Sequence, residues 1–457
     1  MQLIDSHTHL DDKRFDRDVA RVIQRAQDAG IEHLVTIGDR LSSSRKAVAL
    51  SHRYSSLSAT VGVHPHHAKE VDEACLVALA KLADDPVVVA IGEIGLDYHY
   101  GSDTKNIQNS ALRAQLDLAI DLGLPMVIHC RNAADDLLKA LKSVDNPYGG
   151  IIHCFSGNQK QAKEFIKLGY LIGVGGAITF SNAGQLRKTV SQLPIEKIVL
   201  ETDAPYLTPL PKRGRRNEPA FIKYSAHKLA ELFDLSIYDV ARATRCNAIG
   251  IYRLPIDLAP ALAYRIRDSI YLNITNACTN QCTFCGSQDD WQVMGHYLKL
   301  PQDPTVAELI DAIGDTEKYT EAVFGGIGEP TFRLDVIKEM AGWLHEQGLK
   351  VRLNTNGHGD KINNGVSVVK TLKGLIDEVT VSLNVSSDKR YISLCRPLSD
   401  KFSYQAVKEF ILEAKNEFPK VTATAVDLPN VDLKACRKIA EEELGVEFHV
   451  REYFDLA

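Results

Sequence analysis

Residues 121–129 read DLGLPMVIH, and this short stretch contains the pattern that decides the fold of the first half of the chain. A helical segment ends at Gly123, and the strand-like run 126–129 follows it at once. Glycine is favoured just past the end of a helix, and a continuous apolar run is typical of a buried parallel strand. The same order of helix, glycine and strand recurs at Gly30 and Gly169. The repetition indicates an α/β fold with parallel strands.

Eight such apolar runs, separated by amphipathic stretches, precede Pro255. We predict strands at 3–4, 33–37, 59–63, 87–91, 126–129, 150–153, 171–174 and 198–200. Helical patterns near 219–233 and 236–249 follow the last of them. Eight βα units fit a (β/α)8 TIM-like barrel, which needs roughly 250 residues. The sequence therefore predicts a first domain over residues 1–254.

The second half of the chain restarts the same rhythm after a segment at 255–267, which contains two prolines and which we take as a linker. We predict six further strands, at 270–274, 322–324, 351–354, 379–383, 421–425 and 446–450. Thr305 and Glu308 have the spacing of a capping box for the helix after Pro304. Six βα units predict a partial (β/α)6 barrel over residues 268–457.

Composition limits the classes of partner. The chain has 457 residues, 53 Lys and Arg against 59 Asp and Glu, and a net charge of −6, so any recognition of phosphate must be local. The opening MQLIDSHTHLDD lacks the pattern of a secretory signal, and no apolar run approaches the ~18 residues of a membrane span. We expect a soluble, cytoplasmic protein with no membrane partner. In that reducing compartment the 9 cysteines favour metal chemistry over disulfides.

Ligand-type side chains gather where the predicted strands of the first half end. Eleven of the 15 histidines precede Pro255. The residues at strand ends are His7, His9, Glu93, His129, His153 and Asp203. A lone histidine there is usually structural, but the strand ends of a barrel meet at one rim, where barrel enzymes place their chemistry. Four imidazoles and two carboxylates on one rim are a ligand set for two divalent ions with a bridging carboxylate.

Six stretches of the first half resemble the TatD family of metal-dependent deoxyribonucleases. In order over residues 1–254 they are DSHTHLDD, VGVHPHHA, AIGEIGLDYHY, MVIHCRNA, IIHCFSGN and ETDAPYLTPLPKRGRRNEP. The resemblance implies that the six strand-end residues named above are metal ligands, that Glu93 bridges, and that Asp203 is also the general base. It further implies a hydrolase of phosphodiester bonds, specifically a 3′-end exonuclease on single-stranded DNA or RNA.

Substrate phosphate needs positive groups near this rim. A basic loop with Lys212 and Arg215 follows the Asp203 strand. Our candidates for phosphate contact are His64, His66, Arg131, Arg213 and Arg216. The histidine-rich ligand set favours Zn²⁺ or Mn²⁺, while the family resemblance admits Mg²⁺.

Two other functions remain compatible with the same rim. A dinuclear site also hydrolyses carboxylic esters, amides or lactones of small molecules. Alternatively, the barrel only binds a substrate and delivers it to the second domain. The basic loop favours phosphodiesters over the first alternative, and the complete ligand set argues against the second.

A cysteine motif opens the second domain. Residues 271–285 read YLNITNACTNQCTFC, which places Cys278, Cys282 and Cys285 in a C-x3-C-x2-C spacing. Three thiolates hold a [4Fe–4S] cluster and leave one iron open to a further ligand. A zinc site would need a fourth ligand, for which Cys395 or His296 stands at no recognised spacing. We expect Cys395 to be a buried structural thiol.

The motif, with Phe284 before its last cysteine, is similar to that of the radical S-adenosylmethionine (SAM) superfamily, and the resemblance covers about 268–457. The stretch GGIGEP at 325–330 resembles the glycine-rich motif whose backbone meets the methionyl group of SAM. The implied SAM contacts are Gly325, Gly326, Gly328, Glu329, Asn354, Asn356, Ser382 and Asn384. The resemblance implies reductive cleavage of SAM to a radical that abstracts hydrogen, with an electron donor of flavodoxin or ferredoxin type.

Overall fold

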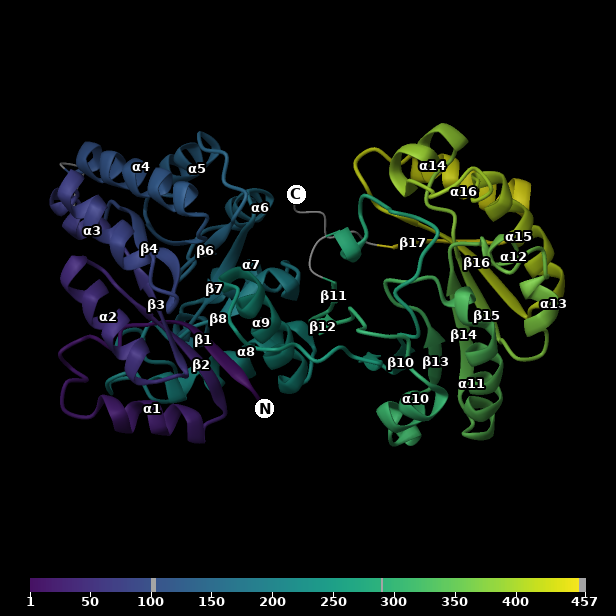
Figure 1. Ribbon diagram of the computed structural model, residues 1–457, viewed down its shortest axis with the longest axis horizontal. Helices are drawn as coiled ribbons and strands as arrows, with labels where there is room; N and C mark the ends of the chain where they lie inside the picture. Colours follow the sequence, from purple (N-terminus) through teal and green to yellow (C-terminus); the bar gives the residue numbers. More distant parts are fainter. Residues whose placement is uncertain (100–103, 289–290, 452–457) are drawn as a thin grey trace. The chain divides into compact units, whose positions relative to one another are not determined.

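The computed structural model describes residues 1–99, 104–288 and 291–451 (Figure 1). The chain divides into two compact units, the first comprising Met1–Asp257 and the second beginning at Leu258. Both are α/β structures built on a mainly parallel sheet. Within the described ranges, no helix is both long enough and apolar enough to cross a membrane.

Eight parallel strands form the first unit in sequential order. They are β1 Leu3–Thr8, β2 Ile31–Ile37, β3 Leu57–Val61, β4 Val88–Asp97, β5 Met126–Arg131, β6 Gly150–Ile152, β7 Tyr170–Val174 and β8 Ile198–Leu200. The ring closes just beyond β8, where Thr8 forms a parallel bridge with Ala204 and the Asp203 amide donates to the His7 carbonyl at 2.9 Å. The predicted (β/α)8 barrel is confirmed.

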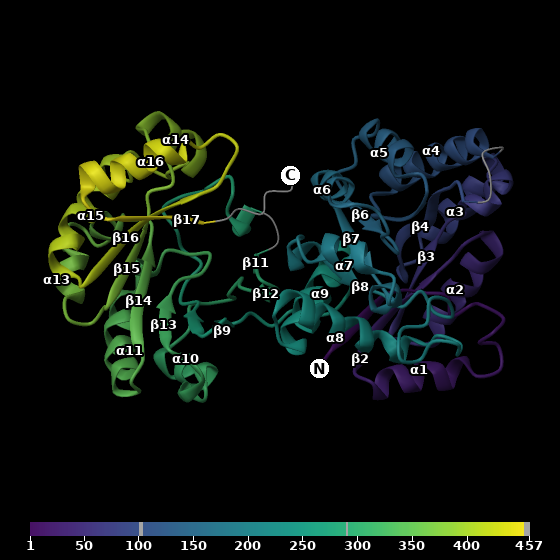
Figure 2. The ribbon, with the colours of Figure 1, turned by 180° about the vertical axis from the view of Figure 1, so that it is seen from behind.

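Helices surround these strands on the outside (Figures 1 and 2). They are α1 Val19–Asp28, α2 Leu41–Arg53, α3 Glu73–Ala83, α4 Lys105–Leu122, α5 Ala134–Lys142, α6 Gln159–Lys167, α7 Gly184–Val190, α8 Ile222–Phe233 and α9 Ile237–Tyr252, with short helices η1 Pro65–Glu70, η2 Gly176–Thr179, η3 Ile195–Lys197 and η4 Pro219–Phe221. Gly30, Gly123 and Gly169 have φ of 90°, 69° and 84°, the left-handed region that glycine enters without a steric cost. The three glycines therefore end helices as the sequence predicts.

The barrel strands are buried along their length. All ten residues of β4 are buried, as are all six of β1. Most of these side chains are apolar, but several near the carboxyl ends of the strands carry titratable groups, including His7, Glu93 and Asp97. Buried ionisable groups are stable only when they are paired or bind an ion. The carboxyl rim of the barrel is therefore a candidate functional site.

The second unit contains a seven-stranded sheet in the order β17-β16-β15-β14-β13-β10-β9. Its strands are β9 Ala263–Ile266, β10 Ser269–Leu272, β13 Glu321–Phe324, β14 Lys350–Thr355, β15 Glu378–Ser382, β16 Lys420–Val426 and β17 Glu447–Arg451, beside a separate ribbon of β11 Gln292–Val293 and β12 His296–Tyr297. Six strands are parallel, as in the predicted partial barrel. The edge strand β9 is antiparallel to β10 and corrects the prediction for 255–267, where we expected only a linker. Four residues at a sheet edge are too short to give a clear periodic signal.

Helices cover the second sheet between successive strands. They are α10 Val306–Ile313, α11 Leu334–Glu346, α12 Gly359–Ile362, α13 Val368–Leu372, α14 Asp388–Cys395, α15 Tyr404–Glu417 and α16 Leu433–Lys438, with shorter turns η5 Gly286–Gln288, η6 Thr316–Lys318, η7 Pro330–Arg333 and η8 Ile439–Leu444. The capping box is confirmed at α10, where the Glu308 amide donates to Thr305 Oγ1 at 3.3 Å and the Thr305 amide donates to Glu308 Oε2 at 2.8 Å.

Candidate metal centre and cluster site

The carboxyl rim of the barrel brings together the side chains predicted as ligands. His7 and His9, at the end of β1, place their Nε2 atoms 3.3 Å apart. Glu93 Oε2 lies 3.5 Å from the first and 3.7 Å from the second. Asp203 Oδ1 completes this side at 3.9 Å from His7 Nε2 and 3.5 Å from His9 Nε2.

The other oxygen of Glu93 faces a different set of imidazoles. Glu93 Oε1 lies 2.8 Å from His129 Nδ1, 3.9 Å from His153 Nε2 and 3.7 Å from His64 Nε2. Sets of three donor atoms within 4.8 Å of one another are His7, His9 and Glu93; His7, His153 and Asp203; His64, Glu93 and His129; and His153, Cys154 and Glu201. Nitrogen and carboxylate donors at this spacing fit divalent transition metals.

At the rim, the negative carboxylates and the neighbouring histidines stabilise one another's charged forms. Burial alone would raise the pKa of Glu93, but the histidines around it, His64 and His153 first, hold that pKa well below its usual value. Burial opposes protonation of His9, yet its hydrogen bond to Asp203 raises its pKa to about 9. His153, held mainly by Glu201, has a pKa raised to about 10 against the same effect of burial. When no metal ion is bound, protonated imidazoles supply the positive charge that balances the carboxylates.

Two buried carboxylates that the sequence analysis missed hold the histidines in place. Glu201 Oε2 lies 3.1 Å from His153 Nδ1, which directs Nε2 of that ring toward Glu93. Asp97 Oδ2 lies 3.0 Å from His129 Nε2 and 3.0 Å from His66 Nε2. Carboxylates commonly orient metal-ligating histidines in this way. The strand-end rule that found Glu93 would also have found Asp97, which ends β4.

One predicted phosphate contact is corrected by the structure. The Arg216 guanidinium donates to both oxygens of Asp18 at 2.8 Å and to Glu218 Oε1 at 2.9 Å. It also lies over the Phe15 ring, 4.5 Å from its centroid. These partners engage both terminal nitrogens of the guanidinium, so Arg216 fastens the loop to the body of the barrel.

The other phosphate candidates differ in position. His64 lies among the ligand-type side chains rather than outside them, and His66 contacts Asp97. Arg131 is exposed at the end of β5, two residues beyond His129. Arg213 is also exposed, with its guanidinium 4.0 Å from the centroid of the Phe180 ring. Arg131 and Arg213 are therefore the exposed arginines among the five candidates.

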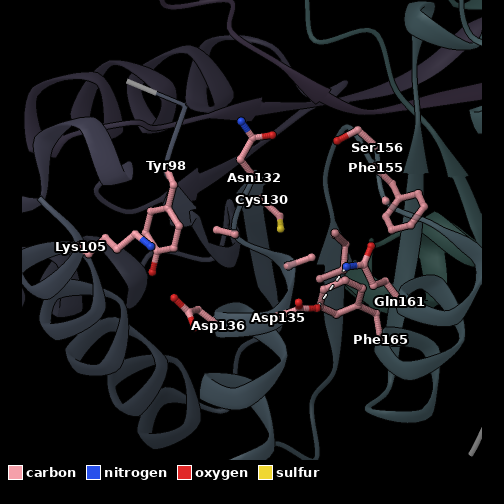
Figure 3. A pocket seen from close by; sticks show the side chains of 14 residues that line it. Tyr98, Lys105, Cys130, Asn132, Asp135, Asp136, Phe155, Ser156, Gln161 and Phe165 are labelled. Atoms are coloured by element: carbon pink, nitrogen blue, oxygen red, sulfur yellow. Dashed lines mark hydrogen bonds between the residues drawn. The ribbon is translucent and has the colours of Figure 1, made fainter. Parts of the chain in front are cut away.

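A cavity of about 440 Å³ lies beside the rim (Figure 3). Tyr98 lines one side and Phe155 and Phe165 line the other, with Asn132 and Asp136 among the polar groups between them. The cavity adjoins the candidate metal ligands, because its lining includes Cys130, the neighbour of His129 on β5. Its size and its mixture of aromatic and hydrogen-bonding groups suit a small planar ligand.

The three motif cysteines lie on the loop that follows β10. The Cys285 amide donates to the Cys282 carbonyl at 3.1 Å, and Asn356 Nδ2 lies 3.7 Å from Cys278 Sγ. Burial, then the charges of Glu329 and the other two thiols, raise the pKa of Cys278 to about 12. Among the described residues, no set of three donor atoms within 4.8 Å includes these thiols.

The glycine-rich stretch packs against the cysteine loop. A Cβ on Gly328 would lie 2.0 Å from the Thr275 carbonyl oxygen, so only glycine fits there. The Glu329 amide donates to the Ala277 carbonyl at 2.7 Å. Residues 325–330 therefore fix the approach to Cys278, which supports a shared site for the two motifs.

Glu329 itself is directed into the protein, which corrects its expected role as a SAM contact. Its Oε1 accepts from the Thr331 hydroxyl at 2.6 Å and the Thr355 hydroxyl at 2.8 Å. Its Oε2 accepts from the Asn356 amide at 2.7 Å. The carboxylate therefore joins the loops after β13 and β14 and sets the position of Asn356.

We expect Glu329→Ala to destabilise the second unit by about 3 kcal/mol, because four donors, three of them buried, lose their acceptor. Both tryptophans of the chain, Trp291 and Trp343, belong to this unit, so urea unfolding followed by tryptophan fluorescence reports on it alone. Glu339→Ala, an exposed position on α11, is the control and should change stability by less than about 0.5 kcal/mol. Equal midpoints for the two variants would contradict the role of Glu329.

The remaining SAM candidates gather at the carboxyl ends of β14 and β15. Asn354 Oδ1 is buried without a hydrogen-bond partner, which leaves an acceptor ready for a ligand. Arg451, a residue the sequence analysis missed, donates to Ser382 Oγ at 3.3 Å and to Asn384 Oδ1 at 3.1 Å. Together with the glycine-rich loop, these polar groups fit the amino-acid and ribose parts of SAM.

The geometry defines an enzyme of two parts. One is a TIM-type barrel whose rim gathers histidines and carboxylates, and the other is a partial barrel with three thiols beside a glycine-rich loop.

Comparisons with known proteins agree with this class. Residues 4–253 match the family model described as TatD related DNase, and residues 272–442 match that of the radical SAM superfamily. The chain is 37% identical over 253 residues to the uncharacterized metal-dependent hydrolase YabD of Bacillus subtilis, covering 55% of this chain and 99% of that protein. It is 37% identical over 228 residues to the 3′-5′ ssDNA/RNA exonuclease TatD of Klebsiella pneumoniae, covering 49% and 87%. The crystal structure of YjjV, a TatD homolog from Escherichia coli K12, superposes with a TM-score of 0.53 at 34% identity, covering 55% of this chain and 98% of that one.

The chain belongs to the TatD related DNase family, and it carries a radical SAM domain after the family's barrel. It is a TatD-like metal-dependent nuclease domain fused to a radical SAM domain.

Proposed function

We propose that the first unit removes nucleotides from the 3′ end of single-stranded nucleic acid, with two divalent ions bound at the rim. The observation that carries the proposal is the position of Glu93, whose two oxygens face separate sets of imidazoles. One carboxylate between two donor sets is the arrangement of a bridged pair of ions. The relative in Klebsiella pneumoniae that is named an ssDNA/RNA exonuclease supports this class of substrate.

The residues of the rim have distinct roles in this reaction. When bound, the two ions would activate water and stabilise charge on the phosphodiester oxygens. His7, His9, His129 and His153 supply nitrogen donors, and Glu93 joins the two halves. Asp203 is the carboxylate with access to a reactant, since 13% of its side chain is exposed against 4% for Glu93. Asp203 therefore takes the proton from the attacking water.

Substrate binding uses the surroundings of the rim. The exposed guanidinium groups of Arg131 and Arg213 contact backbone phosphates, which position the strand without reading its sequence. The cavity between Tyr98 and Phe155 receives the base of a nucleotide, because every base offers an aromatic face for stacking.

A 3′-labelled single strand incubated with Mg²⁺, Mn²⁺ or Zn²⁺ tests the proposal. We expect release of labelled mononucleotides with at least one of these ions, and loss of release when a chelator is added. The histidine-rich donor set favours Mn²⁺ or Zn²⁺ over Mg²⁺. Hydrolysis of carboxylic esters or lactones without nucleotide release would instead assign the site to small molecules.

Metal binding should release protons. At pH 7 the metal-free site holds protons on His9 and His153, whose pKa values are raised to about 9 and about 10. Metal ligation needs neutral imidazole, so affinity should rise between pH 6 and pH 9 by up to about tenfold per pH unit for each proton displaced. Calorimetry in buffers of different ionisation enthalpy measures the number of protons. The exposed histidine variant His52→Gln should behave as wild type, and a heat independent of the buffer would contradict the prediction.

We expect Glu201→Gln to weaken metal binding about 10- to 100-fold, because the charge that orients His153 is removed while the shape is kept. Metal content after dialysis against graded free-metal buffers measures the effect. Glu231→Gln, on the exposed face of α8, should leave affinity unchanged. An unchanged affinity in Glu201→Gln would show that His153 needs no partner for its orientation.

We propose that the second unit binds one [4Fe–4S] cluster on Cys278, Cys282 and Cys285 and SAM against the loop 325–328. The unpartnered Asn354 Oδ1 and the polar groups of Asn356, Ser382 and Asn384 line the SAM side. When bound, the cluster and SAM supply reductive cleavage of the SAM sulfonium bond. A flavodoxin- or ferredoxin-type donor in a reducing cytoplasm would provide the electron. Anaerobic reconstitution with iron, sulfide, SAM and dithionite should yield 5′-deoxyadenosine.

A further inference from the structure

The side chain of Asn356, the residue after β14, contacts one of the motif cysteines. Its Nδ2 lies 3.7 Å from Cys278 Sγ and 2.8 Å from Thr279 Oγ1. Its Oδ1 accepts from the backbone amide of His358 at 3.0 Å. Because a backbone amide can only donate, the oxygen of Asn356 must face His358 and the nitrogen must face the sulfur. The contacts therefore fix the orientation of this side-chain amide and direct one of its N–H groups at Cys278.

Thr279 and His358 continue this hydrogen-bond chain away from the sulfur. Thr279 Oγ1, which accepts from Asn356, lies 2.9 Å from His358 Nδ1. On the other side of the ring, His358 Nε2 lies 3.3 Å from the carbonyl oxygen of Ser403. A carbonyl can only accept, so Nε2 carries the ring proton and Nδ1 accepts from the Thr279 hydroxyl. These contacts leave one arrangement of hydrogens along the chain, in which the imidazole is neutral.

The surroundings of His358 hold its ring in place. His358 and Thr279 are 0% and 1% exposed, so water does not compete for their hydrogen bonds. The Tyr391 hydroxyl lies 3.3 Å from Nε2 and can accept a second hydrogen bond from it. The rings of Tyr391 and Phe402 lie against the imidazole, with centroids 5.9 Å and 5.4 Å from its own. A satisfied buried network is rigid, so Thr279 keeps its acceptor and Asn356 keeps its orientation.

We propose that Asn356 donates a hydrogen bond to Cys278 as a cluster ligand and so raises the reduction potential of the cluster. His358 is a positioning residue, because it holds Asn356 in this orientation through Thr279. Both roles rest on the proposed binding of the cluster by the three motif cysteines. When a donor passes one electron to the cluster, the cluster and its thiolates become more negative by one charge, and no bond forms or breaks. A hydrogen bond to a ligand sulfur stabilises that added charge and favours the reduced state.

A redox titration of the full-length, reconstituted chain without SAM tests the role of Asn356, with the reduced cluster followed by electron paramagnetic resonance (EPR). We expect about tenfold less reduced cluster in Asn356→Leu than in wild type at the same applied potential, because one hydrogen bond to the charged sulfur is lost. For a one-electron couple this corresponds to a midpoint about 59 mV lower. After exchange into deuterated water, the signal of a deuteron coupled to the cluster should be weaker in this variant. Asn416→Leu, an exposed position on α15, is the matched control and should keep both wild-type values.

Substitutions of His358 separate the effect of hydrogen bonding from that of polarity near the cluster, because His358 reaches the sulfur through Thr279 and Asn356. His358→Leu removes the acceptor of the Thr279 hydroxyl and should give roughly threefold less reduced cluster at the same applied potential. His358→Asn has a side-chain oxygen bonded to Cγ, as Nδ1 is in histidine, so it should restore the wild-type midpoint. A residue that only supported the fold would change the stability of the variants and leave their midpoints equal. If Asn356→Leu fails to hold iron, the two His358 variants decide.

Iron content and midpoint together distinguish a failure of these roles from a failure of the cluster site. Equal midpoints in wild type, Asn356→Leu and His358→Leu, at equal iron content, would overturn the role of Asn356 and leave the cluster site intact. A midpoint in His358→Asn as low as that in His358→Leu would overturn the positioning role of His358. Wild-type protein that takes up no iron and gives no EPR signal would overturn the proposed cluster site, and with it the roles of both residues.

Discussion

Asp203→Asn is expected to lower nucleotide release from a 3′-labelled single strand by at least ~10²–10⁴-fold, the range for loss of a general base. Asp203 Oδ1 lies within 3.9 Å of the Nε2 atoms of His7, His9 and His153, so the change removes a charge from the centre of the site. The pKa of Asp203 is lowered by its hydrogen bond to His9 and by nearby histidine charges, against the effect of burial, which keeps it ionised at neutral pH. Asparagine cannot accept the proton that this carboxylate takes.

A matched control separates charge from backbone conformation. Asp203 has a φ of 55°, and Asp234, an exposed residue after α8, has a φ of 51°. Asparagine tolerates this left-handed region nearly as well as aspartate, so both substitutions preserve the backbone. Asp234→Asn should keep wild-type release. Unimpaired release by Asp203→Asn would contradict the role of Asp203 as the general base, whereas no release by the wild-type chain would favour a barrel that only binds its substrate.

The interior of each barrel strand was predictable from sequence, while the carboxyl ends of β1 and β4 were not. The run at 3–4 predicts the start of β1, but the strand continues to Thr8 through Asp5 and His7. Likewise β4 extends to Asp97, well past the apolar run that ends at residue 91. From the sequence, the polar residues at these strand ends are predicted to lie in loops, because burial of such groups is normally unfavourable. They are buried here because they surround one another at the site.

The order of the strands was enough to predict which residues of the candidate site meet, but it did not predict their other contacts. Residues at the ends of sequential barrel strands must meet, which places Glu93 near His129 without further information. Arg216 shows where this rule fails, because its partner Asp18 is almost two hundred residues away and belongs to the loop before α1. Glu329 shows a second limit, since a motif fixes the residue type but not the direction of its side chain.

Cys282→Ala is expected to abolish 5′-deoxyadenosine formation while nucleotide release by the barrel remains within about twofold of wild type. Two thiolates cannot hold the cluster that three hold, so iron content should fall from about four per chain to nearly none. The barrel should be unaffected, because its core and the core of the second unit are separate clusters of buried side chains. Absorbance near 400 nm and iron analysis measure the loss independently of activity.

The control for this substitution is Cys436→Ala, which removes a fully buried thiol from α16 in the same unit. It should cost about 1 kcal/mol of stability and keep the cluster, because its sulfur belongs to the packing of the helix against the sheet. If Cys282→Ala retained four irons and 5′-deoxyadenosine formation, another thiol would have to replace Cys282, and the buried Cys395 of the same unit is a candidate. The double variant Cys282→Ala/Cys395→Ala decides that case, since it also removes the candidate replacement thiol.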